Sequence, residues 1–210
     1  MKLLLLGATG VVGRKILEFA LANEALSQII APTRLALERS DRLVNPVAPR
    51  LESLVSVAMS YKPDIVICAL GTTQAIAGSR PGFRYVDYEL PVAFGEAAYA
   101  AGVQTYAIVT AMGASAQSRS FYYRTKGEVE RDLQKIGFRS LTISRPSLIG
   151  GDRIEPRPIE EIALMAARIL APILPKRFHV NPAEMIAASL LDAAITGKTG
   201  RHWIQAEDMH

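Results

Sequence analysis

The sequence predicts an α/β fold: a doubly wound, mostly parallel β-sheet with helices on both of its faces. Short apolar runs, typical of strands buried on both faces, alternate along the chain with stretches of helical period. The first apolar run, residues 3–6, leads at once into a glycine-rich turn and then into a helical pattern with Val12, Ile16 and Ala20 on one face. Such a strand–turn–helix order opens a βαβ unit, and its repetition indicates a parallel sheet.

The same two patterns, short apolar runs for strands and a helical period for helices, predict the remaining elements. Strands are expected over residues 3–6, 27–31, 42–48, 65–70, 103–110, 139–144 and 201–205. After the first helix, further helices are expected over residues 51–60, from a cap near Asp87 to Gly102, over 122–136 and 159–170, and from Asn181 as N-cap onward. Residues 72–84 are long for a βα connection, which indicates either part of a substrate site or a loop without function.

Composition and charge limit the classes of protein to consider. The 210 residues, half of them hydrophobic, fit one domain, in which we expect residues 147–210 to contribute a small substrate-side extension. The net charge is +4 and the basic residues are scattered, which favours a solvated surface over a nucleic-acid interface. The apolar start is too short for a signal peptide or a membrane helix. We therefore expect a cytoplasmic protein without a nucleic-acid or membrane partner.

Cysteine and histidine usage predicts neither a disulfide nor a metal site. The single Cys68 lies in an apolar run and is expected to be a small buried side chain. The histidines, His179, His202 and His210, have no metal-binding spacing.

The glycine-rich turn predicts a phosphate cradle. Gly7 permits a tight turn, Gly10 lets the backbone approach a pyrophosphate, and Gly13 lets helix and strand pack closely. The N-terminus of the following helix then offers free N–H groups to the anion. A purely structural turn is the alternative, but the flanking strand and helix favour nucleotide binding. The expected contacts are Gly7, Thr9, Gly10, Val11, Val12, Gly13 and Arg14.

The end of the second strand indicates which dinucleotide is bound. In a Rossmann unit an acidic residue there accepts hydrogen bonds from the adenosine ribose, whereas an arginine can hold a 2′-phosphate. No Asp or Glu occurs between Ser27 and Leu37, and Arg34 lies where the phosphate is expected. Arg14 could reach the same group, since a guanidinium binds phosphate with two hydrogen bonds. We therefore expect NADP(H) rather than NAD(H), with a solvated Arg34 as the alternative.

A tyrosine and a lysine form the candidate proton donor. Tyr122 and Lys126 are four residues apart at the start of a predicted helix, so they lie on the same face. A nearby ammonium stabilises a phenolate, and such a pair can protonate a carbonyl oxygen as hydride reaches its carbon. Lys126 can also bond the nicotinamide ribose, and Gly127 would let the helix lie close to the cofactor. An exposed helical turn is the alternative, which the order of the elements disfavours.

With these motifs the chain resembles the atypical short-chain dehydrogenase/reductases. The motifs are the segment 7–14, Cys68-x-x-Gly71-Thr72-Thr73, Tyr122-x-x-x-Lys126-Gly127-Glu128-Val129-Glu130, and Arg145-Pro146 with Asp152-Arg153. The branch it looks most similar to is the Tat-interacting-protein oxidoreductase family, in a compact form. The resemblance implies NADPH binding, with Thr9, Gly10, Val12 and Arg34 on the adenine half. It also implies that Tyr122, Lys126 and Pro146 lie towards the nicotinamide, and that Leu70, Gly71 and Thr72 pass close to the cofactor.

One departure from the reductase pattern concerns a serine that orients the substrate carbonyl at the end of the fifth strand. This chain has Thr110-Ala111 there. Thr110 can supply a hydroxyl and Ser115 is a substitute, although threonine is also a natural strand residue and serine a natural loop residue.

The sequence therefore predicts an NADPH-dependent oxidoreductase that reduces a small carbonyl-type substrate, with Tyr122, Lys126 and Thr110 as catalytic residues. A non-catalytic NADPH-sensing regulator or assembly factor is the alternative. A nucleotide-sugar epimerase or dehydratase ranks lower, since few residues follow Pro146 for a substrate lobe. A homodimer through an exposed helix pair is an open option.

Overall fold

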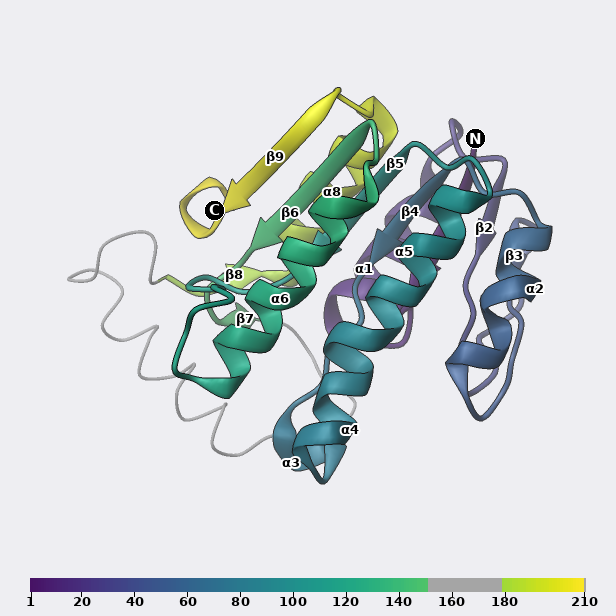
Figure 1. Cartoon of the computed structure of the whole chain (residues 1–210). Coiled ribbons are helices and arrows are strands. Elements are labelled where there is room, and N and C mark those ends of the chain that lie inside the picture. The colour runs from purple at the N-terminus through teal and green to yellow at the C-terminus, as the bar shows by residue number, and fades with distance from the viewer. Residues whose placement is uncertain (151–178, 210) are drawn as a thin grey trace.

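The computed structural model describes residues 1–150 and 179–209, and its centre is a seven-stranded parallel sheet (Figure 1). The strand order is β3-β2-β1-β4-β5-β6-β9, and every neighbouring pair is parallel. The strands are β1 (Lys2–Leu6), β2 (Gln28–Ile30), β3 (Leu43–Val44), β4 (Ile65–Cys68), β5 (Thr105–Val109), β6 (Ser140–Arg145) and β9 (Gly200–Gln205). The prediction of a doubly wound α/β fold is confirmed.

Both faces of the sheet are covered, which explains the unbroken apolar runs. Leu3 and Leu5 of β1 face a core built with α1 (Val11–Ala22) and α8 (Ala183–Thr196). Leu4 and Leu6 face a second core, built with α2 (Val55–Ser60), α5 (Leu90–Ala100) and α6 (Phe121–Ile136). A 3₁₀ turn, η1 (Leu51–Leu54), precedes α2. Figure 1 shows α5 and α6 side by side on their face of the sheet.

The topology places a crevice between β1 and β4. From β1 the chain moves outward to β2 and β3, then returns to the other side of β1 and continues through β4, β5 and β6. The strand order therefore reverses between β1 and β4. In parallel sheets, ligands bind outside the carboxyl ends of the strands at such a reversal.

The segment after β4 differs from the loop expected over residues 72–84. It holds two short helices, α3 (Gln74–Ala77) and α4 (Arg80–Arg84), because the side chains of Thr73 and Ser79 cap their first turns. A π-helical turn, η2 (Tyr85–Glu89), then joins α4 directly to α5. The expected helix start near Asp87 is therefore wrong, since Asp87 lies inside a continuing helix.

The C-terminal part completes the sheet layers. The expected N-cap role of Asn181 is wrong: it lies in the short strand β8 (Asn181–Pro182), which pairs with β7 (Ile149–Gly150). Its buried amide accepts a hydrogen bond from the Ser147 N–H and donates to the carbonyls of Ala206 and Met209. A short turn, η4 (Ala206–Asp208), follows β9. The helix predicted over 159–170 and the Asp152-Arg153 pair lie outside the described residues.

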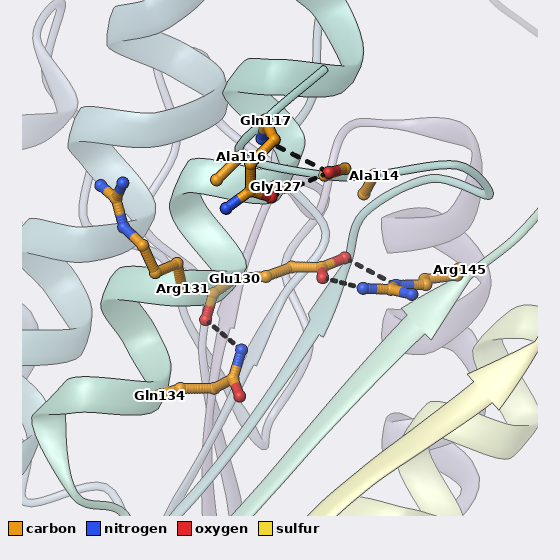
Figure 2. Close-up of a pocket in the computed structure, with 9 residues that line it drawn as sticks. Ala114, Ala116, Gln117, Gly127, Glu130, Arg131, Gln134 and Arg145 are labelled. Carbon is orange, nitrogen blue, oxygen red and sulfur yellow. Dashed lines mark hydrogen bonds and ion pairs between the residues drawn. The ribbon is translucent and has the colours of Figure 1, made fainter.

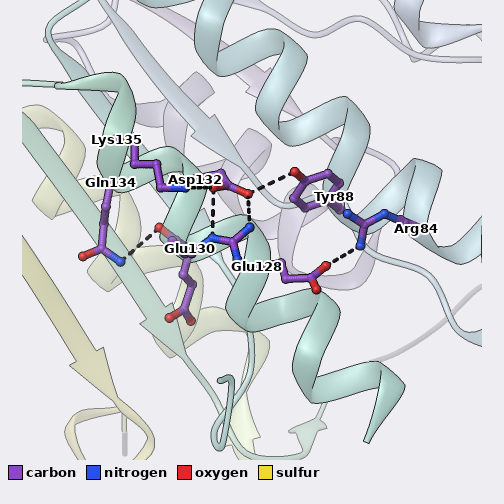
Figure 3. A network of polar contacts seen from close by, with 8 residues as sticks. Arg84, Tyr88, Glu128, Glu130, Asp132, Gln134 and Lys135 are labelled. Atoms are coloured by element: carbon purple, nitrogen blue, oxygen red, sulfur yellow. Dashed lines mark hydrogen bonds and ion pairs between the residues drawn. The ribbon is translucent and has the colours of Figure 1, made fainter. Parts of the chain in front are cut away.

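Polar contacts fix α6 against α4 and η2, as Figure 3 shows. Arg84 pairs with Glu128, and its guanidinium lies 4.0 Å from the Tyr88 ring centroid. The Tyr88 hydroxyl donates to Asp132 over 3.0 Å. These contacts set the position of α6, which carries Tyr122 and Lys126. Within the described residues, no helix combines the length and apolar character needed to cross a membrane.

Candidate active site

The glycine turn after β1 is closely packed where the sequence requires glycine. Gly7 has a φ of +86°, and a Cβ on it would lie 2.6 Å from the carbonyl of Ala69. A Cβ on Gly13 would lie 1.9 Å from the carbonyl oxygen of Gly7. Any larger side chain would therefore force α1 away from β1, and β1 away from the segment after β4.

The open side of the turn suits an anion. Gly10 is exposed and forms the N-cap of α1, and no side chain caps this helix. The first turn carries no acidic residue. A 12-residue helix thus presents uncapped N–H groups and partial positive charge beside an exposed glycine, which fits a pyrophosphate. Of the flanking residues, Thr9 is exposed, Val11 and Arg14 are half-buried, and Val12 is buried.

The segment after β4 connects the cradle to α6. Ala69 lies against Gly7, as described above, and Gly71 lies near Asp87 and Lys126. A Cβ on Gly71 would be 3.9 Å from Lys126 Nζ and 3.7 Å from Asp87 Oδ1. Residues 69–71 therefore contact both the glycine turn after β1 and the Lys126 region of α6.

Lys126 is buried in an ion pair that the sequence analysis missed. This residue is 5% exposed, and Nζ lies 2.7 Å from Oδ1 of Asp87, which is 1% exposed. Burial lowers the pKa of Lys126, but the negative charges of Asp87 and of ionised Tyr122 outweigh it and leave the pKa raised. The ammonium therefore stays charged at neutral pH. The sequence analysis interpreted Asp87 as a helix cap, because no motif connects it with Lys126.

Tyr122 lies one turn before Lys126 on α6. It is half-buried, and its ring centroid lies 5.7 Å from that of Phe83 on α4. Its neighbour Tyr123 is 41% exposed. The structure thus places Tyr122, Lys126 and Gly71 at the same end of the sheet, and their roles toward a cofactor stay predictions.

Thr110 lies at the end of β5, and its hydroxyl is used within the protein. It donates to Glu130 Oε1 over 2.6 Å. Glu130 also forms a two-pronged ion pair with Arg145 of β6 (Figure 2). A shallow pocket of about 250 Å³ adjoins this cluster, between the segment 114–117 and α6. The other candidate hydroxyl, that of Ser115, donates to Gln117. Substrate-orienting roles for Thr110 and Ser115 stay predictions.

Gly127 serves a different contact from the one expected. A Cβ on it would lie 2.1 Å from the backbone of Ser115 and 2.2 Å from that of Ala116. This glycine therefore lets α6 pack on the segment after β5 rather than on a cofactor.

The other predicted cofactor residues lie at the same end of the sheet. Arg34 is exposed a few residues after β2, and Pro146 follows β6 with its carbonyl accepting from the Met112 N–H. Leu70 and Thr72 are half-buried beside Gly71. Cys68 is buried, which raises the pKa of its thiol to about 11. Among the described residues, no group of His, Cys, Asp and Glu could hold a metal ion.

The sheet order and the glycine turn define the class of fold: a Rossmann-like α/β protein with a parallel sheet. Solved structures agree on the fold. The Bordetella bronchiseptica enzyme WbmH in complex with NAD⁺ has a TM-score of 0.74 at 14% identity, over 98% of this chain and 75% of that one. Thermus thermophilus UDP-glucose 4-epimerase in complex with NAD has a TM-score of 0.71 at 18% identity, over 98% and 78%.

Sequence relatives show the family. The chain is 35% identical over 176 residues to the mitochondrial protein fmp52 of Emericella nidulans, covering 80% of this chain and 76% of the relative. It is 33% identical over 207 residues to that of Aspergillus fumigatus, covering 93% and 88%. The chain belongs to the Fmp52 family. No protein-family model matches it.

These relatives correct one expectation. They are named mitochondrial proteins, which contradicts the cytoplasmic location inferred from the single cysteine and the short apolar start. Neither of those features separates a reducing cytoplasm from an organelle. The likeness to the Tat-interacting-protein branch stays a prediction.

Proposed function

We propose that this chain is an oxidoreductase that binds NADPH in preference to NADH and reduces a small carbonyl-type substrate. The observation that carries the proposal is the junction at residues 69–71. Ala69 lies against the glycine cradle and Gly71 lies beside Lys126. One extended ligand along this junction would contact an anion site at one end and a phenol–ammonium pair at the other.

In this proposal the chain binds the dinucleotide through two halves of the crevice. The uncapped N-terminus of α1 at Gly10 receives the pyrophosphate, with Gly7 and Gly13 shaping the turn. Arg34 and Arg14 provide guanidinium groups for the adenosine 2′-phosphate. The segment Leu70-Gly71-Thr72 and Pro146 line the nicotinamide half. The bound dinucleotide supplies the hydride.

The chain's own residues supply the proton. Tyr122 donates its hydroxyl proton to the carbonyl oxygen as negative charge develops there. Lys126 lies one helical turn away, and its raised pKa keeps it a cation that stabilises the resulting phenolate. Because Lys126 is buried, this charge acts in a medium of low dielectric constant and is screened less than a surface charge.

A second function, a regulator that binds NADPH without turnover, is favoured by one observation. Ala111 has no hydroxyl, and the hydroxyl of Thr110 already donates to Glu130. If neither Thr110 nor Ser115 orients a carbonyl, the site would bind the cofactor but lack the group that places the substrate.

Calorimetry and one matched pair of variants test both functions. Wild-type protein is titrated with NADPH and with NADH, and NADPH oxidation is followed with a panel of aldehydes, ketones and quinones. We expect tighter binding of NADPH, and a loss of turnover of about 10²- to 10⁴-fold in Tyr122→Phe because the general acid is removed. The control is Tyr123→Phe, which changes the exposed neighbour and should keep wild-type turnover.

Each outcome decides between the functions. Binding without oxidation of any substrate in the panel would favour the regulator. Equal turnover of Tyr122→Phe and Tyr123→Phe would remove Tyr122 from the mechanism. No uptake of either dinucleotide would refute both functions.

A further inference from the structure

We propose that Asp87 is a positioning residue, which holds Lys126 and the segment after β4 in one fixed arrangement. The inference rests on the proposed function, in which Lys126 acts on Tyr122 and residues 70–72 lie beside the dinucleotide. Through Asp87, the charge that tunes the proton donor is tied to the backbone that lines the cofactor crevice.

The contacts of one carboxylate carry this inference. Oδ1 of Asp87 lies 2.7 Å from Lys126 Nζ, and Oδ2 accepts a hydrogen bond of 2.9 Å from the Thr72 N–H. Oδ1 has this ion pair but no hydrogen-bond partner among the residues that the structure describes. Asp87 therefore connects α6, through Lys126, with the segment between β4 and α3, through Thr72.

The local backbone explains how Asp87 reaches this position. It lies in the middle of the π turn η2, between α4 and α5. A π turn holds one more residue than an α turn, and such turns occur frequently at functional sites. The turn places a carboxylate on the buried side of the helix, among groups that would otherwise be apolar. A buried charge of this kind needs a partner, and Lys126 is that partner.

The surroundings of Lys126 make its charge depend on Asp87. The titratable groups that face it are Asp87 from η2, Tyr122 from its own helix and Cys68 from β4. Burial alone would drive the ammonium to lose its proton, and Asp87 is the foremost group that opposes this. Neutral Lys126 would neither stabilise a phenolate nor donate charge-assisted hydrogen bonds to a ribose.

The test compares Asp87→Asn, Asp87→Ala and Asp87→Glu with the control Glu128→Gln. Asparagine keeps an acceptor for the Thr72 N–H and removes the charge, whereas alanine removes both. The control breaks another ion pair that joins the same part of the chain to α6, that of Arg84 with Glu128. Lys126 is titrated by NMR of ¹³C-labelled lysine side chains, with Lys126→Arg for assignment, and hydrogen exchange of the Thr72 amide is measured. NADPH affinity is measured at pH 7 and pH 9.

We expect the pKa of Lys126 to stay raised in the wild type and in Glu128→Gln, and to fall in Asp87→Asn because burial is then no longer offset by the carboxylate charge. Asp87→Glu should restore a charged Lys126. Exchange of the Thr72 amide should be roughly tenfold faster in Asp87→Ala but not in Asp87→Asn. NADPH affinity of Asp87→Asn should fall more steeply from pH 7 to pH 9 than that of the wild type, because the lysine loses its proton at a lower pH in this variant.

Failure of this inference and failure of the proposed function are distinguishable. Wild-type titration of Lys126 in Asp87→Asn would overturn the positioning role even if NADPH binds. The lysine and amide measurements need no ligand, so they decide the role of Asp87 even if the wild type binds no dinucleotide. If Asp87→Ala does not fold, Asp87→Asn and Asp87→Glu still decide it, since each keeps either the size or the charge.

Discussion

Two of the carboxylates that the structure describes, those of Asp87 and Glu130, are buried near the carboxyl end of the sheet, and their contacts differ. Asp87 and Glu130 are 1% and 2% exposed, and each faces a cation, Lys126 and Arg145 respectively. Glu130 accepts hydrogen bonds from the Thr110 hydroxyl and from two nitrogens of Arg145. Within the described part of the chain, Asp87 accepts one hydrogen bond, from the Thr72 N–H, and its other oxygen takes part in the ion pair without a hydrogen bond.

The difference separates a structural network from a functional one. A buried carboxylate whose oxygens are fully bonded holds its neighbours rigidly, and here it joins β5, β6 and α6. Asp87 has fewer hydrogen bonds than Glu130 and is held to its cation by the ion pair. We therefore expect Glu130 to contribute mainly to the stability of the carboxyl end of the sheet, and Asp87 to contribute to the proposed function through Lys126.

The largest expected effect on stability comes from Glu130→Ala. This change leaves Arg145 without its partner and the Thr110 hydroxyl without its acceptor, so we expect the free energy of unfolding to fall by about 3 kcal/mol. Urea denaturation measures it. The control is Glu128→Ala on the same helix, whose more exposed pair with Arg84 should contribute less than about 1 kcal/mol. Equal losses in both variants would contradict the contrast between the two carboxylates.

The parts of the site that the sequence predicted are those set by neighbours in the chain. Gly7 and Gly13 lie in one turn between a strand and a helix, so their spacing alone indicates a tight crossing. Tyr122 and Lys126 are one helical turn apart, so their shared face follows from the period of the helix. Both features depend on local geometry.

The parts that the sequence did not predict depend on contacts between distant elements. Asp87 reaches Lys126 only because a π turn joins α4 to α5, and no residue pattern marked that turn. Glu130 lies four residues after Lys126, and nothing in the helix itself shows that it binds Arg145 of β6. Gly127 was assigned to a cofactor because its true neighbours, Ser115 and Ala116, come from an irregular segment.

A smaller effect is expected from Thr110→Val, which removes the hydroxyl and keeps the shape. Glu130 loses one donor, so we expect the free energy of unfolding to fall by about 1 kcal/mol with NADPH affinity unchanged. In the Glu130→Ala background the same change should cost almost nothing, because the two residues share one network. A double-mutant cycle measures this coupling. Unchanged stability with a large loss of turnover would instead place Thr110 in the mechanism, as the sequence predicted.

The smallest loss in the free energy of unfolding is expected at Asp132, a carboxylate that belongs neither to the Glu130 contacts nor to those of Asp87. Asp132 on α6 accepts hydrogen bonds from Arg131 foremost, and from Lys135 and Tyr88, which hold the pKa of its carboxyl well below the usual range. A lowered pKa in the folded state stabilises the protein above the ordinary value near 4, and this contribution is lost as the pH falls towards the folded-state pKa. Asp132→Asn should therefore lower the free energy of unfolding by about 0.5–1 kcal/mol at pH 7. The difference from the wild type should narrow below about pH 4, where the unfolded chain binds the proton more readily than the folded one. Urea denaturation at pH 7 and pH 3 measures both values, and a loss as large as that of Glu130→Ala would show that burial does not set the difference between these carboxylates.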